Sequence, residues 1–205
     1  MTEKPMPSDP YHDPGFAHSY ARTTRELDLS AVRVRFLAHL PPRPPDSVRI
    51  LDLGSGSGRD ALAFRNAGYP VDAIDPSPIM AQLGEAHSGV PVFVRRAQEL
   101  EASEAWDGIW ACASLLHVAW AELPDVFRRL ECALKPEGIL YTSFKAGGSE
   151  RTVGGRHFTD LNEERLRDRL REAPGLELLE AWESPDLRPE RAHERWFNAL
   201  LRRDA

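Results

Sequence analysis

Three glycines at alternate positions, Gly54, Gly56 and Gly58, constrain the fold of this chain more than any other feature. They follow a short aliphatic segment, 48–53, and precede a helical pattern at 61–67. Because glycine has no Cβ atom, the backbone can turn sharply here and approach a ligand closely. A strand, a glycine-rich turn and a helix in this order are typical of the ligand-binding edge of an α/β sheet. The sequence therefore predicts a nucleotide-like ligand at this turn.

Asp75 lies seventeen residues beyond Gly58, at the end of the next apolar segment. A carboxylate at this place is expected to accept hydrogen bonds from two ribose hydroxyls. The alternative is that the glycines form only a tight loop and that Asp75 only caps the helix after Pro76. The third glycine comes one residue earlier than in the G-x-G-x-x-G sequence of dinucleotide enzymes. This spacing disfavours a nicotinamide-dependent oxidoreductase.

Strand and helix patterns alternate along the rest of the chain. Alternation of this kind builds a doubly wound α/β fold, with a parallel sheet and helices on both faces. The last two apolar segments, 176–182 and 193–201, have no helix between them and predict an antiparallel hairpin at one edge of the sheet. Further strands are expected at 69–74, 92–94, 107–112 and 139–144.

The charge and composition of the chain restrict its partners. It has 26 Lys and Arg residues against 32 Asp and Glu residues, a net charge of -6. A negative net charge gives no general attraction to nucleic acid or to anionic membranes. The two cysteines lack metal-ligand spacing, and the sequence has no signal region and no apolar stretch long enough to span a membrane. We therefore expect a cytoplasmic protein without a metal site, a monomer or a homodimer, that binds neither nucleic acid nor membrane.

Three sequence motifs occur in a fixed order: Asp52-x-Gly54-x-Gly56-x-Gly58, Asp75 at the end of the next strand, and Leu134-Lys135-Pro136-Glu137-Gly138. Their order resembles that of the class I S-adenosylmethionine-dependent methyltransferases over about residues 48–144. The resemblance implies a doubly wound, Rossmann-like α/β sheet of seven strands whose last strand is antiparallel. It also implies S-adenosyl-L-methionine as the cofactor. One departure is Glu137, which stands at a turn position where the family usually has the first glycine of Pro-Gly-Gly.

The resemblance also implies which residues bind the cofactor. The glycines line its methionine and ribose portions, Asp75 holds the ribose, and Gln98 with Glu99 flanks the adenine. Tyr20 is expected to reach the cofactor carboxylate, although ordinary packing explains this aromatic residue equally well. The full set of expected cofactor-binding residues is Tyr20, Asp52, Gly54, Gly56, Gly58, Asp75, Pro76, Ser77, Gln98, Glu99 and Ala113.

The chain is expected to divide at about residue 46. Residues 47–205 form the class I methyltransferase domain by this resemblance, and residues 1–46 form a tail and helices that cover the cofactor and acceptor site. The proline-rich start, 1 to about 14, predicts a flexible or late-ordering tail. Residues 107–117 are similar to small stand-alone methyltransferases, including tellurite-resistance-like relatives. Such enzymes usually methylate small molecules.

His117, just beyond the fourth expected strand, is the candidate catalytic base. A sulfonium methyl is already activated, so the protein mainly aligns the acceptor and excludes water. Histidine can take a proton from the acceptor because its reference pKa lies near neutrality. The alternative is that His117 only hydrogen-bonds a neighbouring loop. Cys112 is disfavoured as a nucleophile, because it lies in an apolar strand without an expected cation nearby.

The segment after the fifth expected strand, 145–158, contains four glycines and three fixed positive charges against one negative charge. A mobile basic loop of this kind could close over an anionic acceptor, with arginine binding a carboxylate or phosphate through two hydrogen bonds. The alternative is a solvated hairpin whose arginines pair with Glu150 or with the glutamates at 163–164. The expected acceptor-binding residues are Lys145, Arg151, Arg156 and Phe158.

The function expected from these observations is methyl transfer to a small acceptor that is anionic or aromatic. An RNA-modifying methyltransferase is a second possibility, which the acidic charge balance disfavours. A module that binds S-adenosylmethionine without catalysis is a third, and a screen of acceptors would separate it from an enzyme.

Overall fold

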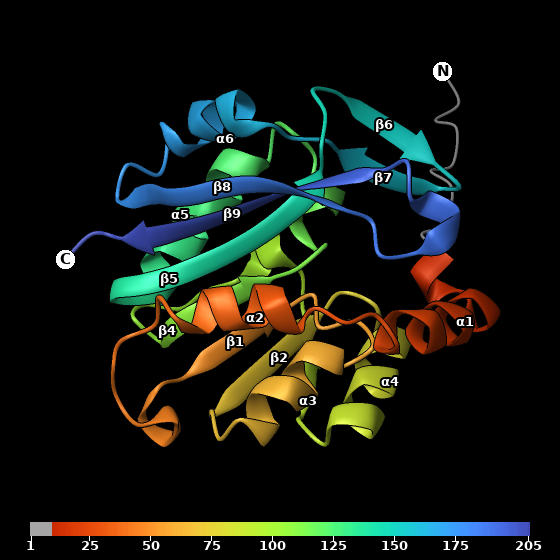
Figure 1. The fold of residues 1–205 in the computed structure, drawn as a ribbon, viewed down its shortest axis with the longest axis horizontal. Helices are drawn as coiled ribbons and strands as arrows, with labels where there is room; N and C mark the ends of the chain where they lie inside the picture. The colour runs from red at the N-terminus through yellow and green to blue at the C-terminus, as the bar shows by residue number, and fades with distance from the viewer. Residues whose placement is uncertain (1–9) are drawn as a thin grey trace.

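The computed structural model describes residues 10–205. Its centre is a seven-stranded sheet in the order β3-β2-β1-β4-β5-β9-β8 (Figure 1). The strands are β1 (Ile50–Leu53), β2 (Val71–Asp75), β3 (Val92–Val94), β4 (Trp106–Ala111), β5 (Leu134–Lys145), β6 (Glu150–Val153), β7 (Arg156–Thr159), β8 (Leu176–Pro185) and β9 (Arg195–Arg203). The helices are α1 (Pro14–Arg25), α2 (Ser30–Leu37), α3 (Arg59–Asn66), α4 (Pro78–Ser88), α5 (Leu123–Ala133) and α6 (Glu163–Leu170). Short 3₁₀ turns are η1 (Pro10–His12), η2 (Pro45–Ser47), η3 (Ala97–Glu99), η4 (Leu115–His117) and η5 (Pro189–Arg191).

The sheet has the predicted topology. Strands β3, β2, β1, β4 and β5 are parallel. Strand β9 lies between β5 and β8 and runs antiparallel to both, which confirms the predicted terminal hairpin and the antiparallel last strand. The fold class is therefore the expected one, a doubly wound Rossmann-like sheet of seven strands.

Apolar side chains fill both faces of the sheet. Along β4, Ile109 packs in the cluster that contains residues of α5 and α6, and Trp110 packs in the cluster that contains residues of α2 and α3. Figure 1 shows these two pairs of helices on opposite faces of the sheet. Trp110 stacks on Tyr141 of β5 with ring centroids 4.1 Å apart, and it contacts Phe36 of α2 and Phe64 of α3. A strand buried on both faces is apolar at consecutive positions, which explains the nearly continuous apolar pattern of 107–112.

The N-terminal segment packs onto α4. Residues 1–9 of the expected flexible or late-ordering tail lie outside the described residues, and in residues 10–14 the structure has η1, the cap Asp13 and the first residue of α1. The Asp13 side chain caps α1 by accepting a hydrogen bond from the Phe16 amide at 2.7 Å, with proline in the first turn. Ala17 and Ala21 of α1 are buried together with Met80 of α4. These contacts hold η1 and α1 beside the glycine turn.

The basic segment after β5 is an ordered hairpin, β6–β7, outside the main sheet. Gly154 and Gly155 both have positive φ, as the two-residue turns favoured in hairpins require. Strand β6 is exposed, whereas Phe158 and Thr159 of β7 are buried. The Thr159 hydroxyl donates to the Val118 carbonyl at 2.7 Å and fixes the hairpin beside η4. The segment therefore has the hairpin form that was the alternative to a mobile loop.

No helix within residues 10–205 is long and apolar enough to cross a membrane.

Gly58 provides a test of how α3 packs against α4. An added Cβ atom would lie 2.4 Å from the Gly84 carbonyl oxygen of α4. We expect Gly58→Ala to lower the free energy of unfolding by about 3 kcal/mol, from overpacking and from the strain of a positive φ. Urea denaturation measures this change.

Gly154→Ala is the matched control, because Gly154 also has a positive φ but has nothing within 4 Å of an added Cβ. This control should lose only about 1 kcal/mol. Equal losses in the two variants would show that the close contact with α4 does not matter.

Candidate cofactor and acceptor site

A cavity of about 400 Å³ lies at the carboxyl ends of the parallel strands. Its walls come from the glycine turn, the N-terminal helices, the hairpin and the segment between β8 and β9. Most of the residues predicted from the sequence line it: Tyr20, Asp52, Gly54, Gly56, Asp75, Pro76, Ser77, Ala113, His117, Lys145, Arg156 and Phe158. The structure therefore brings the expected cofactor and acceptor residues into one space.

The glycine turn is held against the ends of two neighbouring strands. An added Cβ on Gly54 would lie 2.2 Å from the Ser114 hydroxyl, so only glycine fits at this position. Gly56 has φ +53° and no atom closer than 3.7 Å to an added Cβ, so it borders the open cavity. Its amide donates to Asp75 Oδ2 at 2.9 Å, and the Ser77 amide donates to Asp75 Oδ1 at 2.9 Å. The predicted carboxylate thus joins the turn to the start of α4.

Two buried oxygens on the cavity wall lack hydrogen-bond partners within residues 10–205. They are Asp52 Oδ2 and Ser55 Oγ. Burial and the nearby Asp60 carboxylate raise the pKa of Asp52 well above its ordinary value. A buried polar atom without a partner is costly, so a ligand that brings hydrogen-bond donors or a cation stabilises this site. The amino group and hydroxyls of S-adenosylmethionine fit that requirement.

Three predicted cofactor-binding residues lie outside the cavity lining. Gly58 packs against α4, as described above. Gln98 and Glu99 lie in η3, where Gln98 Nε2 donates to Glu122 Oε2 at 2.7 Å and Glu99 accepts from the Arg96 amide at 3.0 Å. The structure does not bring these two side chains to the cavity, because η3 packs beside α5.

His117 has one ring nitrogen bound to the hairpin and the other in the cavity. Its Nδ1 donates to the His157 carbonyl of β7 at 2.7 Å. This bond sets the tautomer in which Nε2 is an acceptor, and Nε2 lies 3.5 Å from the Tyr11 hydroxyl. The Phe158 ring contacts the imidazole edge-on, with centroids 5.1 Å apart. His117 therefore binds a neighbouring segment, as the alternative interpretation expected, and its role as a catalytic base stays a prediction.

The basic side chains of the acceptor side differ in their partners. Arg151 binds Asp160 through two hydrogen bonds of 2.6 and 3.1 Å. Its partner is therefore neither Glu150 nor the glutamates at 163–164, which the sequence had suggested as alternatives. Lys145 is held between Asp186 at 2.7 Å and Glu194. Arg151 lies outside the lining of the large cavity.

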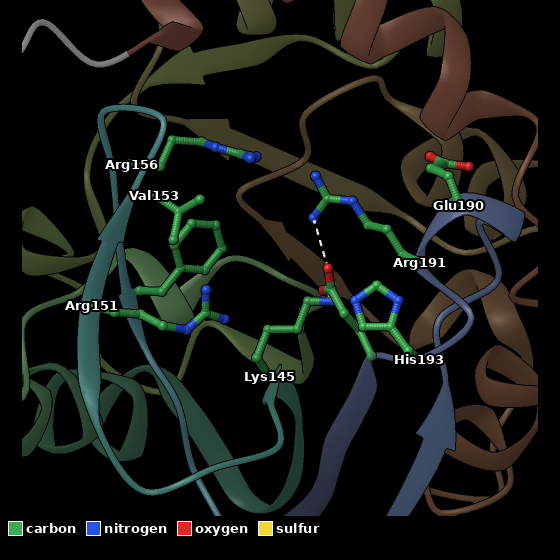
Figure 2. Close-up of a pocket in the computed structure, with 9 residues that line it drawn as sticks. Lys145, Arg151, Val153, Arg156, Glu190, Arg191 and His193 are labelled. Carbon is green, nitrogen blue, oxygen red and sulfur yellow. Dashed lines mark ion pairs between the residues drawn. The ribbon is translucent and has the colours of Figure 1, made fainter.

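Arg156 is the exception among these cations. It makes no ion pair within residues 10–205, its Nε is buried without a partner, and its Nη1 donates to the Tyr11 hydroxyl at 3.4 Å. It lines both the large cavity and a smaller one of about 240 Å³ (Figure 2). Figure 2 shows Arg156 and Arg191 pointing toward one another from opposite walls of the smaller cavity.

Comparison with known proteins agrees with this geometry. Residues 50–138 match the family described as a methyltransferase domain. This match covers less than half of the chain, whose fold is that of S-adenosylmethionine-dependent methyltransferases. It is similar to the ubiquinone biosynthesis O-methyltransferase of Methylobacterium nodulans, with 29% identity over 108 residues, 50% of this chain and 43% of the relative. The match thus spans less than half the length of that relative.

Two solved structures share the fold of this chain. One is the Burkholderia thailandensis 1,6-didemethyltoxoflavin-N1-methyltransferase with bound 1,6-didemethyltoxoflavin and S-adenosylhomocysteine. It is 24% identical, with a TM-score of 0.71, over 100% of this chain and 94% of that one. The other is a TehB-like S-adenosylmethionine-dependent methyltransferase from Corynebacterium glutamicum, 23% identical, with a TM-score of 0.68, over 94% and 100% of the two chains. The resemblance to tellurite-resistance-like relatives is compatible with this second neighbour.

The cavity also has lining residues that the sequence did not single out. Arg59 and Asp60 directly follow the glycine turn and line the cavity, so their position beside the motif was an available signal. Asp60 is buried and accepts hydrogen bonds from Arg59, Arg33 and the Trp110 indole. For the segment between β8 and β9, which includes Arg191, no sequence motif indicated a place in the site. Within residues 10–205, no group of three or more His, Cys, Asp and Glu side chains is placed to hold a metal ion.

Cys112 lies on the cavity wall, and a cation is closer to it than expected. Arg59 Nη2 lies 4.0 Å from its Sγ. Burial and the Asp60 carboxylate nevertheless raise the pKa of Cys112 to about 12. The thiol therefore stays protonated at neutral pH and is a poor nucleophile.

We expect Cys112 to resist alkylation while the exposed Cys132 reacts. Because the pKa of Cys112 is about 12, raising the pH from 7 to 9 should leave almost all of it as the unreactive thiol. Peptide mass spectrometry after brief iodoacetamide treatment measures both sites, and the unfolded protein, in which both should react, is the control. Alkylation of Cys112 before Cys132 in the folded protein would contradict the raised pKa.

Proposed function

We propose that this protein is an S-adenosylmethionine-dependent methyltransferase that acts on a small acceptor, anionic or aromatic in character. The observation that carries the proposal is the cavity at the glycine turn, lined by Asp75 and by Asp52 and Ser55, each of which has a buried oxygen without a hydrogen-bond partner within residues 10–205. When bound, S-adenosylmethionine supplies a methyl group on a positively charged sulfur, whose leaving group is a neutral thioether. The family match of residues 50–138 supports the same conclusion.

The residues have separate roles in this proposal. The turn at Gly54 and Gly56 lies along the methionine and ribose portions of the cofactor, and Asp75 accepts hydrogen bonds from the ribose hydroxyls. Asp52 lies where an ammonium group would relieve its unpartnered oxygen. Tyr20 remains the candidate for the cofactor carboxylate. For the adenine, the roles of Gln98 and Glu99 remain predictions, which this arrangement does not support.

The acceptor side supports a small molecule. The N-terminal helices and the hairpin both contribute to the cavity wall, which leaves space for a compact acceptor beside His117. His117 Nε2 is the proposed base, and Arg156 supplies positive charge for an anionic group. The bound small molecule of the Burkholderia neighbour is consistent with such an acceptor.

The setting of the protein is also a proposal. We place it in the cytoplasm, as a monomer or homodimer, because both cysteines are free thiols and the chain is acidic. The charge balance further disfavours nucleic acid as the acceptor.

Asp75→Ala tests the cofactor site. The ribose hydroxyls would lose a charged acceptor, so affinity for S-adenosylmethionine and S-adenosylhomocysteine should fall about tenfold to a hundredfold, or roughly 1.5 to 3 kcal/mol. Isothermal titration calorimetry measures both ligands. Asp72→Ala is the matched control, because Asp72 lies on the same strand, outside the cavity, and pairs with Arg49. Unchanged affinity in a folded Asp75→Ala protein, or tight binding of a nicotinamide dinucleotide to the wild type, would refute the assignment.

Gly56→Val tests how closely the backbone approaches the cofactor. The branched side chain would extend into the open cavity, so cofactor affinity should fall more than about tenfold. Gly154→Val carries the same positive-φ strain in the hairpin turn and serves as the control. The melting temperatures of the two variants should fall by similar amounts, and only Gly56→Val should lose cofactor binding. Retained binding in Gly56→Val would mean that the glycine only permits a tight turn.

A further inference from the structure

The hydroxyl of Tyr11 lies at a point where a base and a cation meet. His117 Nε2 is 3.5 Å from this oxygen, and Arg156 Nη1 is 3.4 Å from it. The backbone of Tyr11 is fixed because the Ser77 hydroxyl donates to its carbonyl at 2.7 Å, beside the cofactor turn. All four residues line the large cavity. A phenolic oxygen therefore already lies between a basic nitrogen and a guanidinium on the wall of this cavity.

The charge of Arg156 has no compensation from the protein among residues 10–205. Its hairpin neighbour Arg151 is neutralised by Asp160, and Lys145 is neutralised by two carboxylates. The Arg156 guanidinium instead packs against aromatic rings, 5.2 Å from the Phe158 centroid. A partly buried cation without a counter-ion favours a ligand that becomes negative beside it.

The base at this point has its proton-accepting atom directed toward the same oxygen. The His157 carbonyl accepts the Nδ1 proton of His117, so Nε2 is the acceptor nitrogen of the ring and faces the Tyr11 hydroxyl at 3.5 Å. A base that removes a proton and a cation that stabilises the resulting oxyanion are the two groups that activate a hydroxyl for attack. The Tyr11 hydroxyl is in contact with both of them.

The chemistry of the pair selects among possible acceptors. A carboxylate is already ionised near neutral pH and needs no base, and an amine gains nothing from an adjacent guanidinium. An aliphatic alcohol is too weak an acid for histidine, whereas a phenol titrates near 10, within reach of a base assisted by a cation. The rings of Phe16 and Tyr20 lie 5.4 and 5.1 Å from the Tyr11 ring, so the surroundings already accommodate a six-membered aromatic ring.

We propose that His117 and Arg156 activate the hydroxyl of a phenol or a similarly acidic enol, and that Tyr11 occupies this position until the acceptor displaces it. This inference rests on the proposed function, in which the methyl donor binds at the glycine turn. The acceptor proton passes to His117 Nε2, and an oxygen electron pair forms the new O–C bond. The C–S bond of the donor breaks with its electron pair left on sulfur, and the imidazolium later releases its proton to water.

4-Nitrophenol is a suitable probe, because its phenolate absorbs visible light and the neutral phenol does not. Spectrophotometric pH titration with and without S-adenosylhomocysteine gives the acid dissociation constant of the bound probe. Burial raises the pKa of the Tyr11 phenol that occupies this point, whereas its hydrogen bond to Arg156 and the charge of Arg156 lower that pKa. We therefore expect the acid dissociation constant of the bound probe to be about tenfold higher in the wild type than in Arg156→Gln. Tyr11→Phe, which removes the competing hydroxyl, should bind the probe more tightly and keep this dependence on Arg156.

The variants assign the effect to one cation. Arg156→Gln should lower the acid dissociation constant of the bound probe about tenfold, and Arg156→Lys, which keeps the charge, should lower it less. Arg151→Gln should change it by less than about threefold, because Asp160 already binds that guanidinium. Circular dichroism and the affinity for S-adenosylhomocysteine show whether each variant is folded. An equal loss in Arg151→Gln and Arg156→Gln would overturn the assignment.

Two further probes separate the acceptor classes. 4-Nitroanisole lacks the hydroxyl and should bind more weakly than 4-nitrophenol. 4-Nitrobenzoate, which carries a carboxylate, should not bind more tightly than 4-nitrophenol. Tighter, Arg156-dependent binding of the benzoate would replace the phenol with a carboxylate-bearing ligand. Failure of S-adenosylhomocysteine to bind the wild type would refute the proposed function. Binding of S-adenosylhomocysteine with an acidity of the bound nitrophenol that is the same in the wild type and Arg156→Gln would refute only this inference.

Discussion

The carboxylate of Asp75 is the interaction on which the cofactor end of the sheet depends. One of its oxygens accepts from the Gly56 amide in the turn after β1, and the other accepts from the Ser77 amide at the start of α4. Because the acid is buried, both bonds form in a low-dielectric environment. Helix α4 in turn holds α1, whose Arg25 donates to the Leu83 carbonyl at 2.8 Å. One buried acid thus positions both the floor and the cover of the cavity.

The three alternate glycines have different physical reasons to be glycine. Gly54 is required because the end of β4 brings Ser114 against it, and Gly58 because α4 brings the Gly84 backbone against it. Gly56 has room for a side chain on the protein side and is the position that borders the cavity. Two of the glycines therefore build the site by allowing elements to pack closely, and one leaves space for a ligand.

The acceptor side is organised by which cations the protein neutralises. Lys145 and Arg151 are held by carboxylates and so stabilise the positions of β5 and the hairpin. Arg156 faces the cavity without such a partner within residues 10–205. A methyltransferase fold alone does not specify an acceptor, since one fold supports many reactions. What distinguishes this chain is the convergence of His117, Arg156 and Tyr11 at one point of the cavity wall.

The sequence by itself predicted the parallel sheet, the terminal hairpin, the glycine turn and the place of Asp75, because each follows from local spacing and from the alternation of strands and helices. The family resemblance added the number of strands and the antiparallel last strand. Only the tertiary structure decided which side chains meet across elements. The sequence predicted that Gln98 flanks the adenine, but η3 directs its side chain to Glu122 instead of the cavity. Arg151 and Arg156 look alike in the sequence, and only the docking of the hairpin gives the first a carboxylate and the second none. Local patterns set backbone conformation within an element, whereas partners depend on how segments far apart in the chain pack together.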